Sequence, residues 1–459
     1  MKIVIIGDGK VGHKIAKQLS EEDYDIVLID QNEGRIKQTI NNLDILCLAG
    51  DGINIEIQNE ADVPHADLVI ACASTDEQNI LSCLIARRLG ARHTIARVRN
   101  PIFYKQIGFL KEDLRLSLAV NPEFAAADEI SRVLIFPAAA KIEKFVKGRM
   151  ELVEFTLKEG NPIIGLPLKE IYRKHQIKVL VCAVQREQEV YIPYGEFVVQ
   201  AGDKLHIAAT HSQIEQFFKA LGNRKVRIRK VLIAGGGRVG YYLAKQLCAL
   251  GMQVKIIEKR LERCESLCEQ LPKATIIHGD AGDQELLLEE GIKEADAMIA
   301  LTGMDEENII MALFAKKLGV KKIVAKVNED ARAEMVEGLG IDSIVSPKSV
   351  AADMIMSYVR ARNNSYCSTN VETMYRLVGG RVEALEFIIR QKTDYTNIPL
   401  KDLQIKQNNL IAAIGRNRKI IIPGGEDSLQ PGDSVVVVTK NQKIKDIAEI
   451  IEGGTRYEL

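Results

Sequence analysis

The sequence predicts an α/β fold in which parallel, doubly wound sheets alternate with smaller α+β modules. Three observations lead to this prediction. Over residues 1–120, six short apolar runs alternate with amphipathic, helix-like stretches. The pattern then changes to short, turn-rich strands from about residue 150, and the whole arrangement recurs in the second half of the chain. Strands that alternate with helices are typical of a parallel sheet covered by helices on both faces.

The first apolar run ends in a glycine fingerprint. Ile3 to Ile6 read as a buried strand, and Gly7, Gly9 and Gly12 then fit G-x-G-x-x-G before an amphipathic helix. In a nucleotide site these glycines allow a tight turn, close approach of a phosphate, and close packing of helix on strand. The next run ends at Asp30, where a carboxylate can accept hydrogen bonds from a ribose hydroxyl. Glycines, strand, helix and acid together predict a Rossmann-like nucleotide site.

The same fingerprint recurs in the second half. Gly235, Gly237 and Gly240 follow an apolar run, and Glu258 ends the next run at the spacing that Asp30 has in the first half. The chain is therefore an internal duplication. An even, symmetric arrangement of this kind favours assembly into a ring.

Each half divides into a larger and a smaller part. Strands are expected within 2–7, 25–30, 44–50, 66–73, 93–98 and 114–120, and Pro122 should open a helix that leaves the sheet. Short strands follow within 150–157, 178–186, 190–203 and 204–210, with a helix over 212–221. We expect Rossmann-like domains at 1–136 and 226–365, and small subdomains at 137–225 and 366–459. A basic stretch, 223–230, serves as the linker between the halves.

Composition excludes several classes of protein. Lys plus Arg and Asp plus Glu both number 62, so there is no net charge to attract nucleic acid, and none is expected as a partner. No apolar run approaches the ~20 residues that a membrane helix needs, and strand residues follow Met1 at once, which favours a cytoplasmic protein. The eight scattered cysteines read as reduced, buried thiols. The pair Cys264 and Cys268 lacks nearby histidines, so no metal site is expected.

Both halves resemble an RCK (also called KTN) nucleotide-binding domain followed by its small C-terminal subdomain. The resemblance covers essentially the whole chain. It rests on the two fingerprints, on G-D after the third strand, on D-E-x-N after the fourth, and on the I-P-x-G and A/P-G-D turns of the small modules. The tandem arrangement at this length resembles the TrkA family, the peripheral subunits of Trk potassium-uptake systems.

This resemblance implies a function. The chain would be a non-enzymatic regulatory subunit that binds NAD(H) and/or ADP/ATP and gates a membrane-embedded potassium-translocating subunit of the TrkH or TrkG type. It would be a homo-oligomer, a tetramer forming a ring of eight RCK domains, peripheral on the inner face of the plasma membrane.

The residues expected to bind the nucleotide lie at corresponding positions of the two halves. Asp30 and Glu258 could instead cap the following helices. If they meet a ribose they disfavour NADP, because two like charges about 4 Å apart repel by roughly 4 kcal/mol at an effective dielectric near 20. The first-half set is Gly7, Gly9, Lys10, Val11, Gly12, Asp30, Asp51, Ala73, Ser74, Thr75 and Arg97. The second-half set is Gly235, Gly237, Arg238, Val239, Gly240, Glu258, Asp280, Thr302, Gly303 and Lys326.

Several of these positions have structural alternatives. Lys10 and Arg238 could meet phosphate oxygens or could be solvated charges. Asp51 and Asp280 could reach a ribose or base, or cap the next short helix. Asp76 and Asp305 are interpreted as helix N-caps. His13, which follows the last glycine, reads as a residue of the helix surface, and no catalytic residue is assigned.

Two other functions stay open. A nicotinamide-dependent oxidoreductase would need a substrate domain with a general acid or base facing the cofactor, and the small, strand-rich modules offer no obvious one. Alternatively, the chain could be a nucleotide sensor that acts on a partner other than a potassium pathway.

Overall fold

The computed structural model describes residues 1–22, 24–110, 113–135, 141–145, 149–175, 179–221, 228–336, 339–366, 371–378, 381–417, 419–441, 444 and 446–452. Most of the expected linker, Cys367, and the expected boundaries at 136–137 and 225–226 lie outside these residues. The chain forms two compact units, each built from both halves. The first contains Met1–Ile130 and Lys230–Val359, and the second contains Ser131–Arg229 and Arg360–Leu459.

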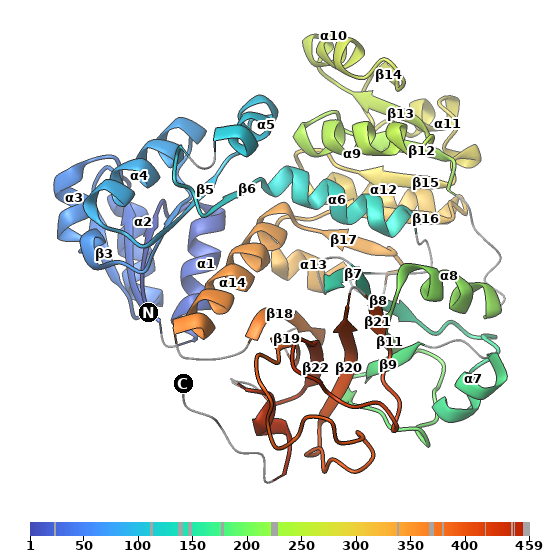
Figure 1. Cartoon of the computed structure of the whole chain (residues 1–459). Helices are drawn as coiled ribbons and strands as arrows, with labels where there is room; N and C mark the ends of the chain where they lie inside the picture. The colour runs from blue at the N-terminus through green and yellow to red at the C-terminus, as the bar shows by residue number, and fades with distance from the viewer. Residues whose placement is uncertain are drawn as a thin grey trace. The chain divides into compact units, whose positions relative to one another are not determined.

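The first half of the first unit is built on a six-stranded parallel sheet with the order β3-β2-β1-β4-β5-β6 (Figure 1). Its strands are β1 (Lys2–Ile6), β2 (Asp25–Asp30), β3 (Leu46–Ala49), β4 (Leu68–Ala71), β5 (His93–Arg97) and β6 (Leu118–Val120). Its helices are α1 (Lys10–Ser20), α2 (Glu33–Asn42), α3 (Ile55–Glu60), η1 (Val63–His65), α4 (Asp76–Leu89), α5 (Pro101–Leu110) and α6 (Pro122–Ile135). The expected strands and the helix at Pro122 are confirmed.

The second half repeats this sheet with the order β14-β13-β12-β15-β16-β17. Its strands are β12 (Lys230–Ala234), β13 (Gln253–Glu258), β14 (Thr275–His278), β15 (Ala297–Ala300), β16 (Lys322–Lys326) and β17 (Ser343–Val345). Its helices are α9 (Arg238–Ala249), α10 (Leu261–Gln270), α11 (Gln284–Glu289), η2 (Ile292–Glu294), α12 (Asp305–Lys317), α13 (Asp330–Val336) and α14 (Pro347–Tyr366). In both sheets the strand order reverses between the first and fourth strands, which pair in parallel, and an open α/β sheet binds its ligand at this point.

Helix α14 of the second half is packed on the first half. Ala351, Ile355 and Val359 are buried in one apolar cluster with Ile3 and Leu28 of the first sheet. Lys14 of α1 donates a 2.7 Å hydrogen bond to Ser349 of α14, and the two helices lie side by side in Figure 1. Amphipathic periodicity predicts an apolar face on such a helix, but it does not say which sheet that face covers. The two Rossmann-like domains therefore share a core.

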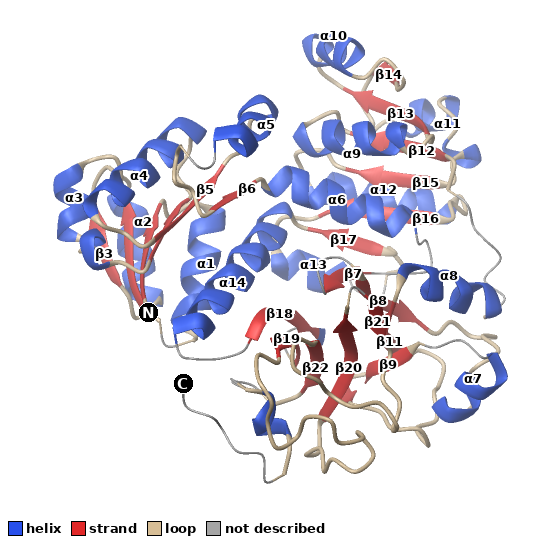
Figure 2. Ribbon diagram, in the orientation of Figure 1, coloured by secondary structure: helices blue, strands red, loops and turns tan. Residues whose placement is uncertain are grey.

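The second unit contains two five-stranded antiparallel sheets (Figure 2). The first-half sheet and its helices are β7 (Lys141–Phe145), β8 (Met150–Thr156), β9 (Leu180–Arg186), β10 (Glu189–Tyr191), β11 (Lys204–Ala209), α7 (Leu168–His175) and α8 (His211–Ala220). The second-half elements are β18 (Val371–Leu377), β19 (Val382–Ile388), β20 (Asn409–Arg416), β21 (Lys419–Ile421), β22 (Ser434–Thr439) and η4 (Ile447–Ile450). The edge strands β7 and β18 were not predicted.

The two small sheets pack against a common apolar core, and each contains the same type of ion pair. Cys182 and Ala208 of one sheet are buried with Val436 and Val438 of the other. In each sheet an arginine donates two hydrogen bonds to a buried aspartate: Arg186 to Asp203, and Arg416 to Asp433. A bidentate pair of this kind fixes the turn before the last strand of the module.

Candidate nucleotide-binding sites

In each fingerprint, the backbone conformation and close backbone contacts require glycine at the first and last of the three positions. Gly7 has φ +103°, and a Cβ there would lie 2.7 Å from the Ala73 nitrogen. A Cβ on Gly12 would lie 1.9 Å from the Gly7 oxygen. Gly235 and Gly240 repeat both features in the second half. These four glycines form the tight turn and hold the helix against the strand.

The middle glycines are different. Gly9 and Gly237 have φ −77° and −62°, which any residue can adopt, and a Cβ on either would meet no atom of the protein within 4 Å. Each is the N-cap of its helix and provides no side chain to satisfy the free backbone N–H groups. The fold therefore does not explain why these positions are glycine. Open space above uncapped N–H groups suits a phosphate that approaches the helix N-terminus.

Lys10 and Arg238 begin helices α1 and α9 next to this open space. Both side chains are exposed, and neither forms a hydrogen bond or an ion pair with the described residues. Val11 and Val239, one residue further on, are buried on the inner faces of the helices. The two cations are thus available to an anion, whereas the valines pack the helices.

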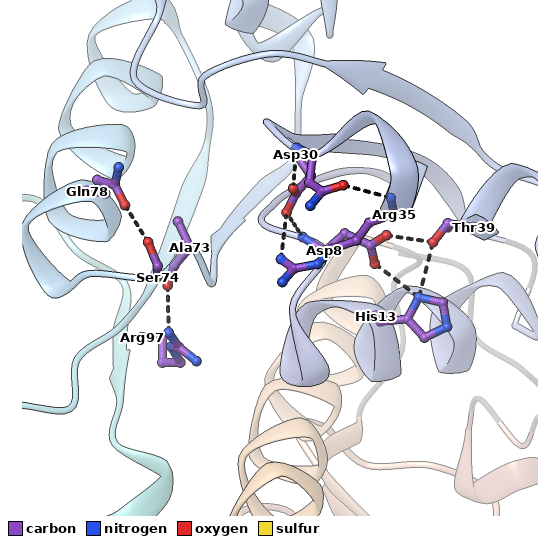
Figure 3. Close-up of polar contacts among 10 residues, drawn as sticks. Asp8, His13, Asp30, Arg35, Thr39, Ala73, Ser74, Gln78 and Arg97 are labelled. Atoms are coloured by element: carbon purple, nitrogen blue, oxygen red, sulfur yellow. Dashed lines mark hydrogen bonds and ion pairs between the residues drawn. The ribbon is translucent and has the colours of Figure 1, made fainter. Parts of the chain in front are cut away.

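The acids at the ends of β2 and β13 hold the fingerprint turns. Asp30 accepts hydrogen bonds from the Asp8 nitrogen at 2.6 Å and the Asn32 nitrogen at 2.8 Å (Figure 3). Glu258 accepts from the Gly236 nitrogen at 2.8 Å and the Arg260 nitrogen at 3.0 Å. The capping alternative is wrong for Asp30, because Asn32 is the N-cap of α2.

Five of the expected residues line one cleft in the first half. Gly7, Asp30, Asp51, Ala73 and Ser74 surround a volume of about 360 Å³ at the carboxyl ends of β1, β2, β3 and β4. Gly9, Lys10, Gly12, Thr75 and Arg97 do not line it. The cleft is at the end of the sheet where the acid and the glycine turn meet, as expected for an adenosine site.

Asp51 and Asp280 close turns and do not cap helices. The side chain of Asp51 accepts from the Ile53 nitrogen at 3.1 Å, and that of Asp280 accepts from the Gly282 nitrogen at 2.9 Å. The caps of the following helices are Asn54 and Asp283, so the capping alternative is wrong here too. Asp280 also pairs with Lys259 at 2.6 Å, and this hydrogen bond is the main reason that the pKa of Asp280 is lowered.

The interpretation of Asp76 and Asp305 as N-caps is wrong. Thr75 is the N-cap of α4 and accepts from the Gln78 nitrogen, whereas Asp76 is the first helical residue. The buried Asp76 carboxylate accepts from the Arg99 and Asn100 nitrogens. Each aspartate therefore fixes the loop that follows the fifth strand of its half, and in the second half Asp305 accepts from the Asn328 and Glu329 nitrogens.

The remaining predicted residues surround the ends of the fourth and fifth strands. Arg97 donates a 2.6 Å hydrogen bond to the Ala73 oxygen, and Thr302 bonds to Asn308 at 2.9 Å. Burial lowers the pKa of both Arg97 and Lys326. Gly303 is exposed and a Cβ there would meet nothing within 4 Å.

Sequence reasoning missed a polar cluster behind the first fingerprint. Asp8 is buried and accepts a 2.6 Å hydrogen bond from the Thr39 hydroxyl, and His13 Nδ1 lies 3.0 Å from its other oxygen (Figure 3). His13, expected on the helix surface, is thus half-buried in this cluster. The sequence signal was the charged residue inside the glycine motif.

Two arginines on the helices after the acids were also missed. Arg35 of α2 lies 3.9 Å from Asp30, and Arg263 of α10 donates a 2.8 Å hydrogen bond to the Gly236 oxygen. They occupy equivalent positions of the two halves, which was the available sequence signal.

Family models match the chain in the same duplicated order. The TrkA-N domain matches residues 3–114 and 231–347, and the TrkA-C domain matches residues 152–222 and 385–452. The chain belongs to the TrkA family. The resemblance expected from the sequence is therefore confirmed.

Curated relatives match this TrkA-family chain along its whole length. A protein of Archaeoglobus fulgidus named Trk system potassium uptake protein TrkA homolog is 31% identical over 98% of this chain and 100% of its own. The Trk system potassium uptake protein TrkA of Halomonas elongata is 31% identical over 100% of both chains.

Solved structures share the tandem RCK fold. The GsuK RCK domain aligns with a TM-score of 0.64 at 20% identity, over 95% of this chain and 92% of that one. The GsuK channel bound to NAD gives a TM-score of 0.65 at 19% identity, over 95% and 76% of the two chains. GsuK bound to ADP gives 0.50 at 16% identity, over 79% and 69%.

The described residues contain neither a candidate metal cluster nor a candidate membrane-spanning helix. No group of three or more His, Cys, Asp or Glu side chains in the described residues is arranged to hold a metal ion. Within the same residues, no helix combines the length and the apolar character needed to cross a membrane.

Proposed function

We propose that this TrkA-family chain is a nucleotide-binding regulatory subunit that assembles on a membrane-embedded potassium-translocating subunit of the TrkH or TrkG type and gates it. It acts without catalysing a reaction, at the cytoplasmic face of the membrane. The full-length match to relatives named Trk system potassium uptake protein TrkA supports the potassium pathway.

The observation that carries nucleotide binding is the pair of middle glycines. Gly9 and Gly237 have ordinary backbone angles and open space above them, so a ligand explains their lack of a side chain where the fold does not. The acids, the cations beside the turns and the remaining site residues predicted from the sequence complete the proposed binding sites.

The proposed ligands are NAD(H) and/or ADP/ATP. GsuK structures with NAD and with ADP support both classes. NADP is disfavoured in the first half, because Asp30 would face its 2′-phosphate, and Arg35, 3.9 Å from Asp30, is an exposed cation. Like charges at that distance repel strongly enough to outweigh one exposed ion pair.

The proposed assembly is a tetramer that forms a ring of eight RCK domains, with the four domains of each chain bounded as the sequence predicts. A nucleotide can gate the partner only if it binds two ring states with different affinities. The shared core of the two Rossmann-like domains supports this, because a change at one fingerprint helix reaches the other half through packed side chains.

Calorimetric titration of the purified chain with NADH and NADPH tests the site. Asp30→Ala and Glu258→Ala should each remove one binding event, since each loses an acceptor for the ribose. Asp25→Ala is the matched control for Asp30→Ala, because Asp25 is exposed at the opposite end of the same strand. Equal affinity for NADH and NADPH would contradict the ribose role.

Potassium uptake tests the pathway. A strain without its own Trk peripheral subunit should regain growth at low external potassium when it expresses this chain, and Asp30→Ala together with Glu258→Ala should reduce the rescue. Turnover of NADH with small carbonyl substrates would support the oxidoreductase instead. Failure to rescue uptake by a chain that binds nucleotide would favour a sensor for another partner.

A further inference from the structure

The two fingerprint turns carry different charges. In the first half, Asp8 occupies the middle of the turn with 6% of its surface exposed, held by Thr39 and His13. In the second half Gly236 stands at this position, and a Cβ there would lie 2.4 Å from Leu267. Each turn is held by one acid, Asp30 or Glu258, so the additional buried carboxylate of Asp8 is specific to the first half. Thr39, at the position of Leu267, makes room for it.

In the second half, positively charged side chains lie around the equivalent fingerprint turn. Arg263 is bonded to the Gly236 oxygen, and Arg260 Nε lies 3.6 Å from Glu258. Burial lowers the pKa of Arg263, and the nearby positive charges of Arg260 and Arg238 lower it further. These guanidinium groups thus share one small region around the turn. In the first half Asn32 stands where the second half has Arg260, and Gln31 stands where it has Lys259.

The difference in charge is large for so small a region. Around the first turn, the acids Asp8 and Asp30 balance the cations Lys10 and Arg35, so the net charge is zero. Around the second turn, Glu258 faces the three arginines Arg238, Arg260 and Arg263, so the net charge is +2, since the charges of Lys259 and Asp280 cancel each other. Lys259 is paired with Asp280. Asp280 and its counterpart Asp51 both accept a hydrogen bond from a backbone nitrogen.

We propose that the two halves bind nucleotides of different charge: the first takes a dinucleotide of the NAD(H) class, and the second takes a nucleoside di- or triphosphate with a free terminal phosphate. The inference rests on the proposed function, since it assigns a ligand class to each proposed site. Each phosphate of NAD has one ester bond and shares the anhydride bridge, so it carries one charge, whereas ADP and ATP carry about three and four charges because a terminal phosphate is nearly doubly ionised at neutral pH.

Asp8 is the specificity-determining residue of the first half. A fixed carboxylate behind the turn repels a phosphate chain in proportion to that chain's charge, so it penalises ATP more than NADH. Burial reduces the screening of this charge by salt. The cations of the second half act in the opposite direction, and an arginine can bind terminal phosphate oxygens bidentately.

The test measures each site separately. Gly237→Val should close the second site and leave the first, and Gly9→Val should close the first and leave the second. Both positions have backbone angles that valine adopts, and a Cβ at either would meet nothing within 4 Å. Titrations with NADH and ATP in EDTA keep magnesium from neutralising the triphosphate. We expect the first site to prefer NADH and the second to prefer ATP, each by about tenfold or more.

Variants that change the charge around each turn should then shift the preference between ATP and NADH. Asp8→Asn keeps an acceptor for Thr39 and should strengthen ATP binding at the first site about tenfold, with a smaller effect on NADH. Lys259→Gln with Arg260→Asn installs the first-half residues and should weaken ATP at the second site to a similar degree. These two side chains are 75% and 74% exposed, so this variant should fold whatever happens to Asp8→Asn.

Lys273→Gln, in an exposed turn at the amino end of β14, is the matched control and should change neither affinity, because the sites lie at the carboxyl ends of the strands. The same preference at both sites, or an unchanged ratio of ATP to NADH affinity in both charge variants, would overturn the inference while leaving nucleotide binding intact. If the unmodified chain binds none of these nucleotides, the proposed function itself fails.

Discussion

The side-chain amide of Asn121 in the first half donates a 3.0 Å hydrogen bond to the phenolic oxygen of Tyr242 in the second half. Both residues are buried. Asn121 also accepts a hydrogen bond from the Phe124 nitrogen at the start of α6, and the Phe124 ring packs edge-on against Tyr242 at 5.4 Å. Tyr242 lies two residues after the last fingerprint glycine, so this contact ties α6 of one half to the fingerprint helix of the other.

Loss of this hydrogen bond should destabilise the shared core. Among the described residues, Tyr242→Phe leaves the buried Asn121 amide nitrogen with a single long hydrogen bond, 3.4 Å to the Arg99 oxygen. A buried donor without a good partner costs about 1–3 kcal/mol, so the urea midpoint should fall measurably. Tyr194→Phe, at a residue 71% exposed, is the control and should leave the midpoint unchanged. Equal midpoints for both variants would show that the contact contributes nothing.

The fingerprint glycines should separate into two classes. Gly9→Ala should fold normally and lose nucleotide affinity, because its Cβ enters open space where a phosphate would lie. Gly12→Ala should fail to fold or should melt well below the unmodified protein, because its Cβ would lie 1.9 Å from the Gly7 oxygen. Thermal melts and titration with NADH check both. Gly108→Ala, on the exposed face of α5, should keep full binding and gain up to about 1 kcal/mol. Unchanged NADH affinity in Gly9→Ala would refute the proposal that a phosphate lies in the open space above Gly9.

Asp76 should contribute more to the free energy of unfolding than the neighbouring N-cap residue, Thr75. Asp76→Ala leaves the Arg99 and Asn100 nitrogens without their carboxylate, and hydrogen bonds to a charged group contribute about 1.5–3 kcal/mol each. Thr75→Ala removes only the N-cap, which costs about 1 kcal/mol. Urea unfolding should rank the two losses in this order, and the reverse order would mean that Asp76 acts chiefly at the helix terminus.

Thiol labelling should follow burial. Cys268 is exposed, whereas Cys72 and Cys182 are buried. Burial raises the pKa of Cys72 to about 11 and that of Cys182 to about 12, so their thiolates are scarce at pH 8. Iodoacetamide at pH 8 should modify Cys268 in the native protein and should reach the other two after unfolding, as peptide mass spectrometry would show. Rapid native labelling of Cys72 would mean that the region behind the fingerprint opens.

Local patterns in the sequence were sufficient to predict the fingerprints. The glycines and Asp30 or Glu258 lie on two consecutive strands of one βαβ unit, so a fixed spacing places them together. The alternation of six apolar runs with helices predicted the doubly wound parallel sheet, whereas the order of its strands came from the structure. The duplication supports the same prediction, because each half shows the pattern independently.

Contacts between distant residues could not be predicted in the same way. Asp76 was interpreted as a cap because it precedes a helix, but its partners are two nitrogens after β5. The Asp8 cluster depends on Thr39, which the chain brings back from a different helix. Helix α14 shows an apolar face in its sequence, yet only the fold reveals that this face covers the first half.

Calorimetric stoichiometry tests the central claim most directly. Titration of the full chain with NADH and ATP should reveal two nucleotide sites per chain, with one lost in Gly9→Val, the other lost in Gly237→Val, and none left in the double variant. Absence of binding by any of NADH, NAD, ADP and ATP to the folded, unmodified chain would contradict the account.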